Sequence, residues 1–144
     1  MSKDLVVKHS IKINAPVTRV WEILTRPEYI RQWDKLPENF GDYEISPATV
    51  IEWPGESRLS VVEFEANQTL RYDLYIPTWE EEVNDVGYTY SLSVDDDGYT
   101  WLTIEIGNFS ILVEGDEYYE NSRVFGHTAS EKIKQLAETN DVLL

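Results

Sequence analysis

Short segments of alternating apolar and polar residues fill the middle of this chain, and they constrain its fold more than any other feature. Such alternation is typical of strands that have one face in a core and the other in solvent. The segments lie at about 43–45, 49–53, 58–66, 69–76, 87–94 and 99–109. Turn-forming pairs separate several of them, namely Pro54-Gly55, Asn67-Gln68 and Asp97-Gly98. The pattern predicts an antiparallel meander with a long acidic loop at 77–86.

The alternation also predicts which side chains face the core. Side chains of one parity are mainly apolar, and we expect them on the concave face: Val62, Phe64, Leu70, Tyr72, Leu74, Ile76, Tyr88, Tyr90, Leu92, Val94, Leu102, Ile104 and Ile106. The opposite parity is richer in polar and charged residues, as expected for a solvent face. Tyr75 and Trp101 are exceptions there, and they either pack together across strands or form an apolar patch that a partner covers.

Helical periodicity flanks the strand region on both sides. Residues 6–13 alternate as a first strand, and Pro16 then begins a short helix over 16–24, followed by a second through 27–33. Near the other end, residues 116–138 predict one long helix. Its stripe has small residues in the middle and consists of Tyr119, Ser122, Phe125 or Gly126, Ala129, Ile133 and Leu136. Small residues let a helix lie close to a sheet or leave space beside it.

Length and composition narrow the architecture and the partners. The chain of 144 residues shows no internal repeat or linker, which predicts a single domain over 1–144. It has no cysteine, which excludes disulfides and thiolate metal sites and suits a reducing compartment. We find no signal peptide and no apolar run near the ~20 residues of a membrane span, so we expect a cytoplasmic protein without membrane insertion. A net charge of −15 disfavours nucleic acid as a partner.

Local sequence resembles a known superfamily. Residues 11–25, IKINAPVTRVWEILT, and 27–33, PEYIRQW, resemble the opening strand, Ala-Pro break, Val-Trp helix and tryptophan-ending second helix of the START or birch-pollen-allergen superfamily, also called SRPBCC. Residues 61–72, VVEFEANQTLRY, resemble its central hairpin. The branch that the chain most resembles is related to the ATPase activator of a heat-shock chaperone. The resemblance covers essentially the whole chain.

The resemblance implies an α+β helix-grip fold, in which a curved antiparallel sheet of about six or seven strands wraps around a long C-terminal helix, with two short helices after the first strand. It also implies a hydrophobic cavity between sheet and helix, which members use for lipids, polyketides, hormones or aromatic compounds. We therefore expect a protein, monomer or homodimer, that binds or carries a small hydrophobic or aromatic ligand. Two alternatives stay open: a cyclase, dehydratase or hydrolase that uses the cavity, which is less favoured, and a protein module that contacts a chaperone.

Aromatic side chains dominate the candidate ligand site. Aromatic walls with a few hydroxyl groups suit an amphipathic ligand, although the same residues could form an ordinary core. The predicted ligand-binding residues are Trp33, Trp53, Phe64, Tyr72, Leu74, Tyr90, Leu92, Ile104, Tyr119, Ser122, Phe125 and His9. Trp21 is left out of this set, because its helix is expected to pack it against the edge of the sheet.

No motif identifies a catalytic residue, a metal site or a cofactor. A G-x-S-x-G elbow is missing, and His9 and His127 have no nearby acid at metal-ligand spacing. His9 has inward parity, so it is either a satisfied histidine at the sheet edge or a hydrogen-bonding group for a ligand. The run Asp95-Asp96-Asp97-Gly98 lacks the alternating spacing of a calcium loop and is expected to form a turn.

Overall fold

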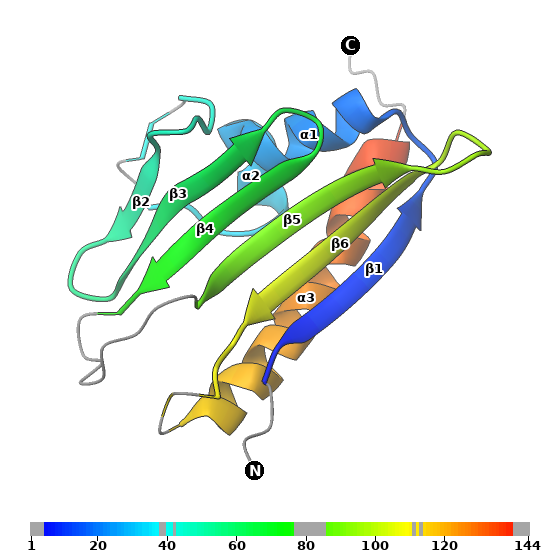
Figure 1. Ribbon diagram of the computed structural model, residues 1–144. Helices are drawn as coiled ribbons and strands as arrows, with labels where there is room; N and C mark the ends of the chain where they lie inside the picture. The colour runs from blue at the N-terminus through cyan, green and yellow to red at the C-terminus, as the bar shows by residue number, and fades with distance from the viewer. Residues whose placement is uncertain are drawn as a thin grey trace.

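The computed structural model describes residues 5–37, 40–41, 43–76, 86–110, 112 and 114–139. An antiparallel sheet of six strands has the order β1-β6-β5-β4-β3-β2, and the helices lie on one of its faces (Figure 1). The strands are β1 Val7–Ile13, β2 Val50–Trp53, β3 Ser57–Glu65, β4 Thr69–Tyr75, β5 Gly87–Val94 and β6 Thr100–Gly107. The helices are α1 Val17–Thr25, α2 Pro27–Trp33 and α3 Gly115–Glu138. The predicted helix-grip architecture is confirmed.

The turns follow the chemistry that the sequence indicates. Asn67 has a φ of 64° at the β3–β4 hairpin, a conformation that asparagine tolerates better than most residues. Gly98 has a φ of 86° at the β5–β6 turn, where the Asp95 carboxylate accepts hydrogen bonds from the backbone N–H groups of Asp97 and Tyr99. The acidic run is therefore a turn, as predicted. Most of the predicted acidic loop at 77–86 lies outside the described residues.

The predicted strand at 43–45 is wrong, since these residues form no strand. Ile45 is buried, but its backbone N–H donates to the carbonyl of Thr25, at the end of α1, rather than to a neighbouring strand. Tyr43 is 81% exposed. One buried apolar residue in an irregular connection can therefore resemble a short strand in the sequence.

A β-bulge overturns the predicted face of Val62. The register of β3 against β4 shifts between Val61 and Glu63, so that Val61 is 9% exposed and Val62 is 51% exposed. An extra residue in one strand exchanges the inward and outward positions on one side of the bulge. A prediction that assumes strict alternation along the whole strand misses this change. Val94 is also exposed rather than buried, because it ends β5 next to the turn.

Tyr75 and Trp101 do not pack together, contrary to one of the two predicted arrangements. Tyr75 lies at the end of β4, where the Arg58 guanidinium stands 4.7 Å from its ring centroid. Trp101 lies on β6 between Lys12 and Ser93, and its indole N–H donates to the Asp95 carboxylate at 3.0 Å. The two aromatic residues thus have separate polar partners.

The small-residue stripe of α3 seats that helix on one half of the sheet, against β1 and β6. Gly126, Ala129, Ser130 and Ile133 are buried there, and a β-carbon at Gly126 would meet Val7 at 3.5 Å. Under β2–β5, by contrast, α1 contacts β5 and β3, while α2 and the first turns of α3 face the rest of the sheet across the pocket. Sheet and helices therefore stand further apart on that side.

Candidate functional site

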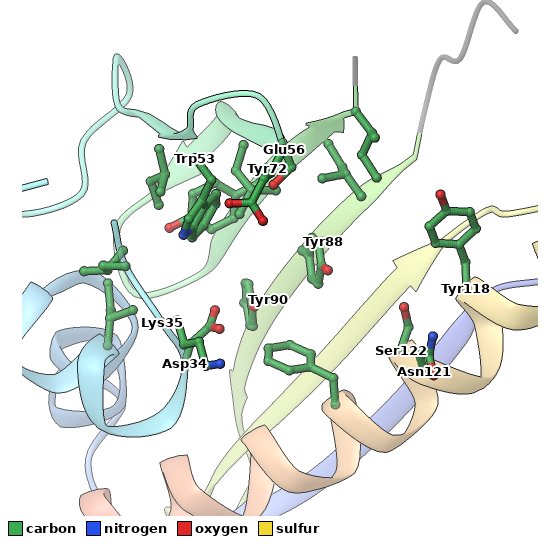
Figure 2. A pocket seen from close by; sticks show the side chains of 18 of the residues that line it. Asp34, Lys35, Trp53, Glu56, Tyr72, Tyr88, Tyr90, Tyr118, Asn121 and Ser122 are labelled. Atoms are coloured by element: carbon green, nitrogen blue, oxygen red, sulfur yellow. The ribbon is translucent and has the colours of Figure 1, made fainter. Parts of the chain in front are cut away.

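A pocket of about 490 Å³ lies between the β2–β5 half of the sheet and helices α2 and α3 (Figure 2). This volume falls within the roughly 300–1,000 Å³ usual for small-molecule sites. The lining residues are Ile30, Trp33, Asp34, Lys35, Leu36, Ile51, Trp53, Glu56, Ser57, Leu59, Tyr72, Leu74, Ile76, Tyr88, Tyr90, Phe109, Tyr118, Asn121, Ser122 and Phe125. Apolar and aromatic side chains make up most of this wall.

The aromatic part of the wall is braced by contacts between its own rings. Tyr90 is in edge contact with Trp33 and with Tyr72, with ring centroids 5.7 and 6.3 Å apart. Tyr88 makes the same kind of contact with Phe125 of α3 at 5.9 Å. The indole N–H of Trp33 donates to the Ile23 carbonyl at 2.9 Å, which fixes that ring to α1. Edge-to-face pairs and this hydrogen bond hold the wall in shape before a ligand arrives.

Asp34 introduces a carboxylate into this apolar wall. Helix α2 ends at Trp33, and Asp34 leaves the helix in an extended conformation while its N–H still donates to the Ile30 carbonyl. The helix end thereby directs the side chain into the pocket, as Figure 2 shows. Burial raises the pKa of Asp34 to about 6, and the backbone N–H and the charge of Lys35 offset only part of that effect. A carboxyl group at this position can exchange a proton near neutral pH.

Three tyrosine hydroxyl groups share the pocket with this carboxylate. Burial raises the pKa of Tyr72, Tyr88 and Tyr90, that of Tyr88 to about 12, and the charge of Asp34 raises all three further. The hydroxyls therefore stay protonated at neutral pH and can donate hydrogen bonds. Within the described residues, no fully buried side-chain oxygen or nitrogen lacks a hydrogen-bond partner. The pocket thus combines an apolar wall, neutral donors and one partly buried acid.

The structure brings part of the predicted site together. The predicted residues that line the pocket are Trp33, Trp53, Tyr72, Leu74, Tyr90, Ser122 and Phe125. Phe64 instead packs on Trp21, with ring centroids 5.4 Å apart, while Leu92 and Ile104 lie in the core and Tyr119 packs against it. The alternation of apolar residues identifies most of the inner face, except at Val62 and Val94, but α3 covers only part of that face. Residues in the filled part do not line the pocket.

His9 lies on β1, away from the pocket lining, and faces α3. Its ring makes an edge contact with that of His127, at 5.5 Å between centroids. Across the described parts of the chain, no group of three or more histidine, cysteine or acidic side chains could hold a metal ion. The two histidines form a contact between strand and helix.

Sequence reasoning missed these polar members of the pocket: Asp34, Lys35, Glu56, Ser57, Tyr118 and Asn121. Tyr88 was assigned to the inner face but not to the site. The available signal for Asp34 was its place directly after the tryptophan that ends the second short helix, which is where a side chain can turn back toward the sheet. With 27 acidic residues in the chain, that signal did not stand out.

Solved structures match this fold over nearly its whole length. A protein from Mesorhizobium loti is 23% identical with a TM-score of 0.70, and the match covers 95% of this chain and 99% of that one. A protein from Bacillus halodurans is 19% identical with a TM-score of 0.69, over 96% of this chain and 100% of that one. The Aha1 dimer structure from Colwellia psychrerythraea is 14% identical with a TM-score of 0.66, and the match covers 95% of this chain and 98% of that one.

No family model matches the sequence, and neither does any curated protein. Among the helices described, none is long and apolar enough to cross a membrane. The resemblance to solved structures concerns the fold, because all of these identities are low. It agrees with the strand order, the paired short helices and the long last helix on the sheet. The chain therefore has the helix-grip fold that these solved structures share, the Aha1 dimer structure among them.

Proposed function

We propose that this protein binds or carries a small hydrophobic or aromatic ligand in the pocket between the sheet and α3. The observation that supports the proposal is the pocket itself, about 490 Å³ in volume and walled mainly by aromatic and aliphatic side chains. Burying about 250 Å² of apolar ligand surface would contribute roughly 6 kcal/mol at about 25 cal/mol per Å². Immobilising the ligand offsets part of this free energy.

A neutral fluorescent probe such as N-phenylnaphthylamine tests the proposal. We expect its emission to rise on mixing with the protein and to fall when small lipids or aromatic compounds compete. Ser122→Trp, which places a large ring in the pocket, should abolish the signal. Val124→Trp is the matched control, because Val124 lies on the same helix but is 58% exposed. Equal signals from both variants would show that the probe binds elsewhere.

A second candidate is an enzyme that uses the same pocket for a cyclase, dehydratase or hydrolase step. Asp34 supports it, because a carboxyl group with a pKa of about 6 beside neutral tyrosine hydroxyls can act as a general acid or base. The carrier function is preferred, since no nucleophile with a positioned base is among the described residues that line the pocket. Turnover of a bound compound by the wild type, lost in Asp34→Asn, would reverse this order.

The third function considered is a protein module that contacts a chaperone. Tyr75 is 47% exposed, but it and Trp101 contact different polar side chains, Arg58 and Asp95, so no contact between the two rings favours this function. One related structure is that of an Aha1 dimer, which supports testing whether this chain is a monomer or a homodimer by sedimentation velocity. We propose the cytoplasm as its location, because a chain without cysteine suits a reducing compartment.

A further inference from the structure

We infer that the pocket recognises an organic cation, an ammonium group on an apolar body, with Asp34 as the counter-ion and the aromatic wall around it. The inference rests on the proposed ligand-binding function and adds the chemical class of the ligand. Three features carry it: a carboxylate without an ion pair among the described residues, the aromatic rings that line the same pocket, and the sign of the charge in the pocket.

The Asp34 carboxylate forms no ion pair with a described residue. Within the described part of the chain, no lysine, arginine or histidine nitrogen lies within 4.0 Å of it. Among the described residues, the backbone N–H of Lys35 and the positive charge of its side chain favour the ionised form, and together they offset only part of the effect of burial. A carboxylate offers about four acceptor positions, so most of its capacity faces the pocket. Desolvated charges are costly unless they are paired, and a cationic ligand would supply that pair.

The rings beside Asp34 suit the rest of an ammonium group. Trp33, Tyr90 and Tyr72 form a continuous set of edge contacts next to the carboxylate, and Trp53 lines the same wall. A cation within about 6 Å of a ring centroid is attracted by the negative face of the ring, most strongly for tryptophan. Figure 2 shows Asp34, Tyr88 and Tyr90 directed toward one space. Methyl groups on an ammonium nitrogen would contact the rings while its charge faces Asp34.

The charge of the pocket discriminates against anions. Among the described lining residues, the ionisable ones other than tyrosine are Asp34, Lys35 and Glu56, which give two acids to one base. The Lys35 side chain is exposed, whereas that of Asp34 is partly buried. The whole chain has a net charge of −15, which raises the local concentration of cations. A fatty-acid carboxylate placed in this wall would be repelled by Asp34.

Three ligands of one chain length test the inference by calorimetry at low salt: decyltrimethylammonium, decanol and decanoate. We expect the cation to bind roughly 10-fold or more tightly than decanol, and decanoate to bind most weakly. Asp34→Asn should remove most of the advantage of the cation over decanol and leave the affinity of decanol unchanged. Asp96→Asn is the matched control, because it removes the same charge from an exposed turn residue. A thermal melt of each variant confirms that it is folded.

A pH series with the same cation adds a second readout, since a quaternary ammonium keeps its charge at every pH. We expect its affinity for the wild type to fall as the pH drops through about 6, where Asp34 takes up a proton. The other groups that face Asp34 are Lys35, Glu56, Tyr72, Tyr88 and Tyr90. The tyrosines stay neutral over this range, and Glu56→Gln separates the second acid. The fall should persist in Glu56→Gln and vanish in Asp34→Asn.

The outcomes separate this inference from the proposed function. If decanol binds in the pocket but the cation has no advantage, or keeps it in Asp34→Asn, the inference is overturned and the ligand-binding function stands. If none of the three ligands binds, both fail. Two competitors assign the source of the cation: a short-chain phosphatidylcholine represents a lipid headgroup, and phenylpropyltrimethylammonium represents a free organic cation. Displacement by either one supports the inference.

Discussion

Replacing Asp34 by asparagine should stabilise the ligand-free protein at neutral pH and leave its stability nearly unchanged in acid. The substitution keeps the shape of the side chain and removes the charge that the pocket desolvates. An aspartate has an ordinary pKa of 3.8, and burial raises that of Asp34 to about 6. The folded protein therefore holds a proton on Asp34 at pH values where the unfolded chain has released it.

The sign and size of the effect follow from proton linkage. Between about pH 4 and 6 the unfolded state binds fewer protons at this site than the folded state, so the free energy of unfolding falls as the pH rises. The pKa values of Asp34 in the folded and unfolded states differ by about two units, at about 1.4 kcal/mol per unit. Above pH 6 the ionised carboxylate therefore lowers the free energy of unfolding by roughly 3 kcal/mol. Asparagine avoids that cost, so the gain should be up to about 3 kcal/mol near pH 7.5 and close to zero near pH 4.

Urea denaturation of both proteins at these two pH values measures the effect. The difference between the variants is informative, because Asp95 and Glu138, whose pKa values are lowered by hydrogen bonds, are present in both and cancel. Asp96→Asn again controls for net charge. An Asp34→Asn variant with the same advantage at both pH values, or with none at either, would refute the assignment of a desolvated carboxylate to the pocket.

Three further predictions concern the packing around the pocket. Phe125→Ala should lower the free energy of unfolding by only about 1–2 kcal/mol, because the ring is partly buried and borders open space. Ile133→Ala, at a fully buried site, should lower it by about 2–5 kcal/mol in the same urea titration. Gly87→Ala should lower the melting temperature markedly, because its β-carbon would stand 2.0 Å from the backbone oxygen of Tyr72; a melt like that of the wild type would contradict this contact. Truncation before Asp116 should abolish the cooperative melt, because the sheet would lose the helix that covers β1 and β6.

The fold was predictable because its signals are local. Alternation and turn residues define the strands from Thr69 to Gly107, and the proline at the start of each short helix marks where that helix begins. Features that depend on a neighbour in space were missed. The bulge at Val61 arises from the pairing of β3 with β4, and Ile45 is buried by a contact with the end of α1.

The site was predictable only in part, for a similar physical reason. Parity shows that Tyr72, Tyr90 and Ile104 face inward, but the position of α3 decides which of them meets open space. The orientation of Asp34 depends on how the chain leaves α2, and no periodicity describes a residue beyond a helix end. The chemically most distinctive side chain of the pocket was therefore the one that pattern analysis could not find.

Gly126 and Phe125 are adjacent on α3 yet face different surroundings, the glycine toward Val7 and Ile106 and the phenylalanine toward the pocket. Space at Gly126 suffices for a methyl group, at 3.5 Å from the nearest atom, but not for a branched side chain without lifting the helix. A bulkier residue there would move α3 away from the sheet and enlarge the pocket without contacting any ligand. The size of molecule that the pocket accepts can thus be adjusted from the face of α3 that packs on β1 and β6, while the residues that line the pocket stay the same.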